Sequence, residues 1–243
     1  GVLLQTCAME GADDAAWSAL AHAQVLQITA AKDELPRRWF VTADLLARCP
    51  QLLAVSSSGS GCDTIDIDAC TRAGVMVMNQ AGGNADSVAE MALGLMLAVL
   101  RRIPESNALL RGQARSFSRE DLMGHELRGR TLGLVGVGEA GRRAAALGRA
   151  FGMQVLGVDP ALDAAQMAAR GAEAVSLDEL LRRADIVSLH CPRDAGTLGL
   201  MNAAAFAAMK PGSIFVITAR GGIHDEAALH AALAIGDLGG AGL

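Results

Sequence analysis

Short apolar runs alternate with helical patterns along most of the chain, and this alternation restricts the fold more than any other feature of the sequence. Short apolar runs bounded by turn residues are typical of buried strands, and a helical stretch between two of them is typical of a βα unit. The pattern is clearest where we expect a strand at residues 131–135, a helix at 139–151 and a strand at 154–158. We therefore predict an open α/β fold with parallel sheets.

The same pattern continues through the rest of the chain. The further strands that we expect lie at residues 2–6, 25–28, 52–55, 75–78, near 174, at 186–189 and at 213–218. The further helices that we expect lie at residues 14–23, 42–49, 66–73, 87–100, 164–170, 176–184, 202–209 and 225–234. A polar, glycine-bearing stretch at residues 79–86 indicates a boundary between a domain of residues 1–80 and a domain of residues 81–243.

Helix starts are marked by residues that can satisfy the first backbone N–H groups. Thr42 is expected to cap the helix that ends before Pro50, and the segments Ser87–Glu90 and Ser176–Glu179 match the capping box. The helix at 87–100 is apolar nearly all round, so we expect it to be buried either between layers or at a dimer contact. Residues 101–128 are predicted to be a more polar connection.

Composition and charge narrow the classes of partner. The formal net charge is −5, with 21 basic and 26 acidic residues and no long run of either sign, so a nucleic-acid partner is not expected. The longest apolar stretch, at 88–100, falls short of the ~20 residues that span a bilayer. The five cysteines are scattered and form no CxxC pair, which argues against disulfides or a zinc site and favours a reducing cytoplasm. Small molecules remain as the expected partners.

The segment Gly136-Val-Gly138-Glu-Ala-Gly141 matches the GxGxxG pattern of dinucleotide-binding turns. It follows an expected strand and opens an expected helix, the context in which the pattern carries meaning. Gly136 would permit the tight turn, Gly138 would let a pyrophosphate approach the backbone, and Gly141 would allow close helix–strand packing. The alternative is an ordinary glycine-rich strand–helix turn.

Asp159 follows the next expected strand, where an acid can accept a hydrogen bond from the ribose 2′-hydroxyl of NAD. A 2′-phosphate would be repelled there, and no Arg or Lys follows before Arg170. The sequence therefore favours NAD over NADP.

Several segments together resemble the D-isomer-specific 2-hydroxyacid dehydrogenases, most of all phosphoglycerate dehydrogenases and hydroxypyruvate or glyoxylate reductases. They occur in that family's order, from about residue 40 to the end of the chain. The matching segments are SSGSGCDTID at 57–66, NADSVAE at 84–90, GLVGVG at 133–138, LHCP at 189–192, MKPG at 209–212 and TARGGIHDEAAL at 218–229.

The resemblance implies two Rossmann-like or flavodoxin-like lobes, a substrate lobe and an NAD lobe, with the C-terminal part missing from this sequence. It implies that Ser60 and Gly61 bind the substrate carboxylate and that Arg220 is the catalytic arginine, which also contacts substrate. The cofactor-binding residues that it implies are Ser60, Gly136, Gly138, Glu139, Ala140, Gly141, Asp159, Cys191, Thr218, Ala219 and Arg220. The resemblance also implies a homodimer, and it implies no metal site.

The chain also departs from the family pattern. Glu139 is an acid where the family commonly has a basic or neutral side chain, which is expected to weaken pyrophosphate binding. Cys191 as a reactive nucleophile is an alternative to its place beside the adenosine. The family continues beyond the position of Leu243 to a Glu and a His that transfer the proton, so we expect a partial sequence that binds NAD without turnover.

Two hypotheses for function remain. The first is an oxidoreductase that transfers a hydride between NAD(H) and a small D-2-hydroxy acid or 2-keto acid. The second is a non-catalytic protein of the same fold that senses NAD. The sequence leaves the identity of the acid open.

Overall fold

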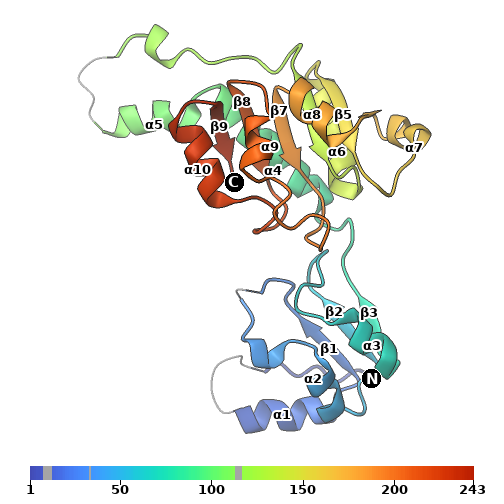
Figure 1. Ribbon diagram of the computed structural model, residues 1–243. Helices are drawn as coiled ribbons and strands as arrows, with labels where there is room; N and C mark the ends of the chain where they lie inside the picture. Colours follow the sequence, from blue (N-terminus) through green and yellow to red (C-terminus); the bar gives the residue numbers. More distant parts are fainter. Residues whose placement is uncertain (8–12, 33, 113–116) are drawn as a thin grey trace. The chain divides into compact units, whose positions relative to one another are not determined.

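The computed structural model describes residues 1–7, 13–32, 34–112 and 117–243, and these form two compact units (Figure 1). Unit 1 is Gly1–Asn84 and unit 2 is Ala85–Leu243. Each unit holds one parallel β-sheet with helices packed on it. The prediction of an α/β fold with parallel sheets is confirmed.

Unit 1 has a three-stranded sheet in the order β1-β2-β3. Its strands are β1 (Val25–Ile28), β2 (Ala54–Ser57) and β3 (Met76–Met78), and its helices are α1 (Asp13–Ala21), α2 (Ala43–Arg48) and α3 (Ile67–Ala73), with a 3-10 turn at Arg37–Trp39. As expected, the Thr42 hydroxyl caps α2 by accepting from the N–H of Leu45 at 3.5 Å. The rings of Trp17 and Trp39 pack at a centroid distance of 4.7 Å.

The prediction of a strand at residues 2–6 is wrong. Residues 1–7 form neither strand nor helix, and Val2, Leu3 and Leu4 are almost fully exposed. An apolar run becomes a strand only where a neighbouring strand accepts its backbone hydrogen bonds, and the sheet of unit 1 ends at β1.

Unit 2 has a six-stranded parallel sheet in the order β6-β5-β4-β7-β8-β9. Its strands are β4 (Thr131–Val135), β5 (Gln154–Val158), β6 (Glu173–Ala174), β7 (Ile186–Leu189), β8 (Ser213–Ile217) and β9 (Leu238–Gly242). Its helices are α4 (Ala85–Leu100), α5 (Ile103–Arg111), α6 (Glu139–Ala150), α7 (Ala164–Ala169), α8 (Leu177–Arg183), α9 (Ala203–Ala207) and α10 (Glu226–Ala234), with a 3-10 turn at Glu120–Leu122. The strand order reverses at β4, which makes the carboxyl end of β4 a topological switch point.

Successive residues of the central strands send their side chains to opposite faces of the sheet. Leu132 and Leu134 of β4 join a core with α4 and α6, whereas Val135 joins a second core with α8, α9 and α10. Helices on both faces explain why these strands are apolar throughout. Because the helices cover both faces, we expect ligands to bind at the ends of the sheet.

The helix expected at 87–100 begins earlier, at Ala85, so Ser87 lies inside α4 and the predicted capping box there is wrong. One face of α4, with Ala89, Ala92 and Met96, is buried in the core of unit 2, while Met91 on another face is 59% exposed. Of the capping box predicted at Ser176, the structure shows one half: the Ser176 hydroxyl accepts a hydrogen bond from Glu179 N at 3.2 Å.

Two elements were not expected from the sequence: α5, which lies within the predicted polar connection, and β9. Two of the three glycines of β9, Gly240 and Gly242, are explained by α4, which lies against the strand. A Cβ at Gly240 would be 2.5 Å from Val99 Cγ1, and one at Gly242 would be 2.8 Å from Leu95 Cβ.

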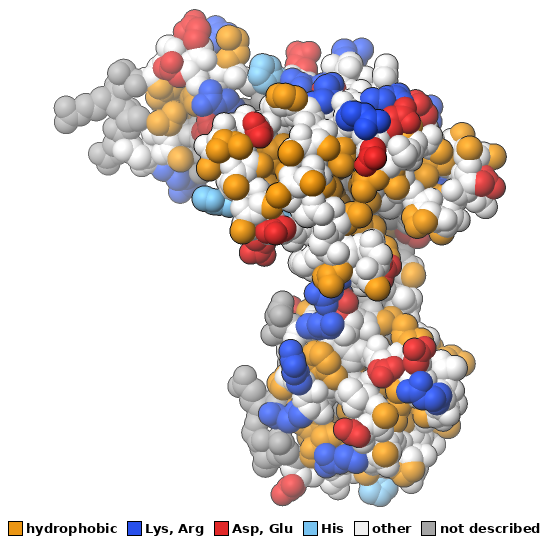
Figure 2. Space-filling model, in the orientation of Figure 1, with side chains coloured by type: hydrophobic (Ala, Val, Ile, Leu, Met, Phe, Trp, Pro, Cys, Tyr) orange, Lys and Arg blue, Asp and Glu red, His pale blue; other side chains and the backbone are white. Residues whose placement is uncertain are grey.

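Charged side chains of both signs are interspersed over the face drawn in Figure 2, without a continuous basic patch. Within the part of the chain that the structure describes, no helix combines the length and the apolar character needed to cross a membrane.

Two glycines in unit 2 offer a test of its packing. A Cβ at Gly133 of β4 would lie 2.6 Å from Leu180 Cδ2 and 2.9 Å from Ala184 Cβ, so Gly133→Ala should lower the free energy of unfolding by about 1–3 kcal/mol. A Cβ at Gly94 of α4 meets nothing within 4 Å, so Gly94→Ala should raise it by about 0.5–1 kcal/mol. Urea unfolding followed by circular dichroism measures both, and equal effects of the two changes would contradict this packing.

Candidate functional site: a dinucleotide crevice at the end of a parallel sheet

The turn between β4 and α6 is built on two close backbone contacts. Gly136 has a φ of +89°, and a Cβ there would lie 2.7 Å from the backbone N of Cys191. A Cβ at Gly141 would lie 2.2 Å from the carbonyl oxygen of Gly136. Only glycine fits both positions, so these two residues serve the packing of the turn.

Gly138 is different, because a Cβ there would meet no atom within 4 Å. It is the N-cap of α6 and its helix has no side-chain cap. The first-turn N–H groups, which include those of Glu139 and Ala140, have no partners within the helix and carry the positive end of its dipole. This combination of open space and unpaired N–H groups suits a pyrophosphate.

Asp159 follows β5 and lies beside the same turn. Its Oδ2 accepts a hydrogen bond from Val137 N at 2.9 Å, and its Oδ1 accepts one from Ala161 N at 3.0 Å. The two backbone donors fix the orientation of the carboxylate. An acid held in this way can accept a further hydrogen bond from a ribose hydroxyl.

The segment after β7 passes close to the glycine-rich turn, and the N–H of His190 donates to Val135 O at 2.8 Å. Burial lowers the pKa of His190 to about 4, so its ring is neutral near pH 7. Cys191 is buried, and burial raises the pKa of its thiol, with the nearby Asp194 and Asp159 carboxylates acting in the same direction. A thiol that stays protonated argues against the nucleophile alternative.

Thr218, Ala219 and Arg220 follow β8, which pairs with β7 in the sheet. The Thr218 Oγ1 atom is buried and has no hydrogen-bond partner among the described residues. The Arg220 side chain is partly buried, and its Nη1 donates to the Ala219 carbonyl at 2.9 Å. All the site residues expected in unit 2 therefore follow the carboxyl ends of four adjacent strands, β5, β4, β7 and β8.

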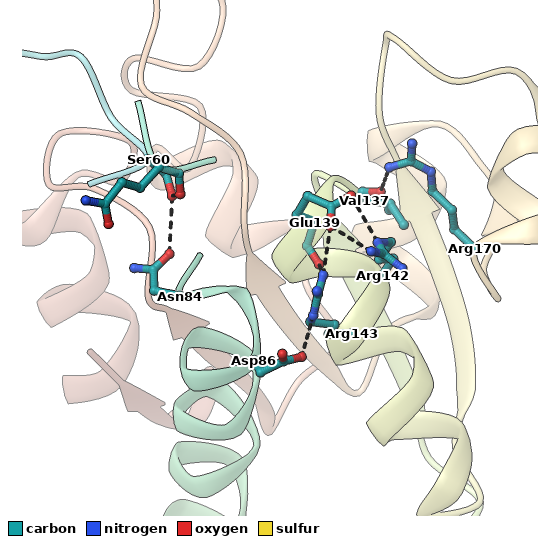
Figure 3. Close-up of polar contacts among 9 residues, drawn as sticks. Ser60, Asn84, Asp86, Val137, Glu139, Arg142, Arg143 and Arg170 are labelled. Carbon is teal, nitrogen blue, oxygen red and sulfur yellow. Dashed lines mark hydrogen bonds and ion pairs between the residues drawn. The ribbon is translucent and has the colours of Figure 1, made fainter. Parts of the chain in front are cut away.

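Two arginines hold Glu139 at the N-terminus of α6 (Figure 3). Arg142 makes a two-pronged contact, Nε to Oε1 at 3.1 Å and Nη2 to Oε2 at 2.7 Å, and Arg143 Nη1 reaches Oε2 at 2.8 Å. Hydrogen bonds from Arg142 and then Arg143 lower the pKa of Glu139 to about 2. Arg143 also pairs with Asp86 of α4. The acid that departs from the family pattern is thus charge-balanced by its neighbours.

In unit 1, the loop after β2 carries Ser60 and Gly61. The Ser60 hydroxyl is exposed and lies 3.2 Å from Asn84 Oδ1 (Figure 3), and Asn79 Nδ2 donates to the Ser60 carbonyl at 2.9 Å. The carbonyl of Gly61 accepts from Ser57 Oγ at 2.6 Å. These bonds set the loop's shape.

Comparison with known proteins decides the family. The D-isomer specific 2-hydroxyacid dehydrogenase NAD binding domain matches residues 93–243. The chain belongs to this family. The 2-hydroxyacid dehydrogenase match covers most of unit 2, including every strand of its sheet.

Three relatives illustrate the likeness. The D-3-phosphoglycerate dehydrogenase of Mycobacterium tuberculosis is 44% identical over 203 residues, which are 84% of this chain and 38% of the relative. The D-lactate dehydrogenase of Aquifex aeolicus, solved with NAD and lactic acid, superimposes with a TM-score of 0.82 at 31% identity over 93% of this chain and 66% of that one. The D-mandelate dehydrogenase of Rhodotorula graminis superimposes with a TM-score of 0.82 at 35% identity, over 95% of this chain and 70% of that one. The chain spans about two fifths of the length of its curated relatives.

The cofactor of this 2-hydroxyacid dehydrogenase domain is NAD. The residues present fit it: Gly138 leaves the helix N-terminus open, and Asp159 presents a carboxylate fixed beside the turn. Thr218 Oγ1 is a buried polar atom without a partner among the described residues. Among the described residues, no group of three or more His, Cys, Asp or Glu side chains could hold a metal ion.

Sequence reasoning missed one contact of the site. Arg170 Nη1 donates to the carbonyl of Val137, in the glycine-rich turn, at 2.6 Å. The only signal in the sequence was that Arg170 is the first basic residue after Asp159, and nothing in the spacing shows that it folds back.

The two roles of glycine in the turn can be separated. Gly138→Ala should lower the affinity for NADH about tenfold, because its methyl group enters the space open to the pyrophosphate, and should leave the melting temperature nearly unchanged. Gly141→Ala should destabilise the domain through the contact with Gly136. NADH fluorescence titration and thermal melting measure the two effects. Unchanged NADH affinity in a folded Gly138→Ala protein would show that no phosphate approaches there.

Proposed function

We propose that the protein is an oxidoreductase that transfers a hydride between NAD(H) and a small D-2-hydroxy acid or 2-keto acid. One observation carries the proposal: three features lie at the same end of the parallel sheet. They are the open helix N-terminus at Gly138, the carboxylate of Asp159 and the loop after β8 that holds Arg220. When bound, NAD supplies the hydride acceptor and NADH the hydride donor.

The first-turn N–H groups of α6 bind the pyrophosphate, together with Gly136, Gly138, Glu139, Ala140 and Gly141 of the turn. Asp159 accepts a hydrogen bond from the adenosine ribose and Cys191 packs beside the adenosine. Thr218 and Ala219 approach the nicotinamide side. The backbone contacts of Gly136, Gly141 and Asp159 fix the turn and the acid before the cofactor arrives, which limits the entropy lost on binding.

Arg220 clamps the substrate carboxylate and polarises the keto oxygen. A guanidinium presents two parallel N–H donors and stays protonated, so it can bind a carboxylate at both oxygens without releasing a proton. We place unit 1 in the role of the substrate domain, where Ser60 and Gly61 contact the carboxylate and Ser60 also contacts the cofactor. The family resemblance supports these assignments.

Proton transfer to the keto oxygen requires a separate acid. His190 is neutral and its Nε2 lies 3.0 Å from Ser188 Oγ, while the buried ring of His224 packs against Phe215. Neither histidine has a carboxylate partner among the described residues. We therefore propose that neither histidine supplies this acid. In a longer protein extended to the length of the relatives, we propose that the added residues supply it. The five unpaired cysteines support a reducing cytoplasm as the location.

The proposed function is tested in two steps. The 243-residue chain should bind NADH in a fluorescence titration. The longer protein should reduce hydroxypyruvate, glyoxylate or 3-phosphohydroxypyruvate, and Arg220→Gln should lower kcat/KM about 100-fold while the surface control Arg182→Gln leaves it unchanged. NADH binding with no turnover of any small 2-keto acid by the longer protein would instead support an NAD-sensing role.

We also propose that the protein is a homodimer. Helix α4 uses one face for the core of unit 2, and large apolar side chains on α4 and α5 remain exposed, among them Met91, Ile103 and Leu110. Burying such side chains contributes about 1.5–3 kcal/mol each. Light scattering at micromolar concentration should give twice the monomer mass, and Leu110→Lys should shift it to the monomer. A strict monomer in the unchanged protein would contradict the dimer.

A further inference from the structure

A hollow of about 530 Å³ lies between α6 and α7, and Glu139 of the glycine-rich turn is one of the residues that line it. Three arginines line it: Arg142 and Arg149 from one face of α6, and Arg170 from the residue that ends α7. The Arg149 guanidinium lies over the backbone of Gly171, since a Cβ at Gly171 would be 3.1 Å from its Nη1. The charged side chains of the walls are thus these three arginines and the carboxylate of Glu139.

The charges around the hollow do not cancel. Arg142 and Arg143 are paired with Glu139 and Asp86, which makes that group neutral. Arg149 and Arg170 have no carboxylate partner among the described residues. Two positive charges are left, which match the charge of −1.5 to −2 that a phosphate monoester carries near pH 7.

Arg170 and Asp159 meet at one residue of the glycine-rich turn. Val137 donates its N–H to Asp159 Oδ2 at 2.9 Å. Its carbonyl accepts from Arg170 Nη1 at 2.6 Å (Figure 3). The backbone N and O of one residue are joined by three bonds and lie at most about 4 Å apart, so the two groups are within roughly 10 Å of each other. Arg170, which lines the hollow, is thus connected through one residue to the acid expected at the ribose.

The local sequence explains why Arg170 reaches the turn. Gly157 of β5 has no side chain, and a Cβ there would lie 2.6 Å from Met167 Sδ and 3.0 Å from Val137 Cγ2. The helix and the turn therefore close over the strand together. A reciprocal capping box of Asp163 and Gln166 fixes the start of α7, and Arg170 follows on its last turn.

We propose that Arg149 and Arg170 receive a phosphate on the adenosine 2′-oxygen, so that the domain binds NADP(H) as well as NAD(H). The proposal rests on the dinucleotide site proposed above. Asp159 opposes a 2′-phosphate by its charge, and the two arginines offset that repulsion. The result is a cofactor preference that is relaxed, with NAD still accepted through Asp159.

Calorimetric titration with adenosine fragments isolates the 2′-phosphate. Adenosine 2′,5′-bisphosphate should bind the 243-residue chain at least as tightly as 5′-AMP. Arg170→Gln should weaken the bisphosphate about tenfold and 5′-AMP less than twofold, because a charge-assisted contact to the 2′-phosphate is lost. Arg149→Gln should weaken the bisphosphate in the same sense, while the exposed control Arg182→Gln should change neither ligand.

Arg170→Lys separates charge from the contact with Val137, because it keeps a cation in the hollow. It should retain most of the affinity for the bisphosphate, and thermal melting checks that both variants are folded. The ratio of the two affinities is the readout, so a general loosening of the turn, which weakens both ligands equally, contradicts the proposal.

Inorganic phosphate distinguishes a site for the cofactor from a site for a free anion. If the hollow receives the 2′-phosphate, inorganic phosphate should compete with the bisphosphate and not with 5′-AMP. Binding of phosphate and bisphosphate together would overturn the proposal in favour of a separate anion site. A third outcome is that 5′-AMP and NADH bind, that the bisphosphate binds tenfold more weakly than 5′-AMP, and that Arg170→Gln leaves the affinity for the bisphosphate unchanged. In that case the proposal fails while NAD binding stands. If no nucleotide binds, both fail.

Discussion

Backbone segments meet at Gly136 and Gly141 more closely than any side chain permits, and the arrangement of unit 2 depends on this contact. The turn after β4 touches the segment after β7 at Gly136, and the first turn of α6 touches Gly136 through Gly141. Any larger residue would lift α6 away from the sheet. Its unpaired N–H groups would then leave the crevice between the strand ends, so the packing of three backbone segments determines where an anion can be bound.

The doubly covered sheet brings the remaining residues to the same place. Because β5, β4, β7 and β8 are parallel and adjacent, the loops that follow them emerge at one edge, although they are spread over residues 136–220. Helices cover both faces through two separate cores, so the strand ends are the places left for a ligand. Asp159, Cys191 and Arg220 follow strand ends at one edge because of this topology and not because of their sequence spacing.

Sequence analysis predicted four strands to the residue: β1, β4, β5 and β7. Three of them, β4, β5 and β7, are central strands whose apolar runs are bounded by turn residues. The wrong strand at residues 2–6 and the missed β9 have one cause: pairing and tertiary contact override local preference. Gly240 and Gly242 of β9 are unfavourable in an isolated strand but necessary under α4. The contact of Arg170 with Val137 spans 33 residues and required the fold to be known.

The charge at the N-terminus of α6 shows how far local rules reach. Arg142 and Arg143 stand three and four residues after Glu139, so their pairing follows from helix geometry and was open to prediction from sequence. The pairing of Arg143 with Asp86 spans 57 residues and was not. Together these pairs neutralise the side chains of the first turn, so the backbone N–H groups and the helix dipole supply the net attraction for the pyrophosphate. The excess side-chain charge, on Arg149 and Arg170, lies instead in the hollow between α6 and α7. From there Arg170 reaches Val137, the residue that also binds Asp159, so this charge can influence which nucleotide is bound.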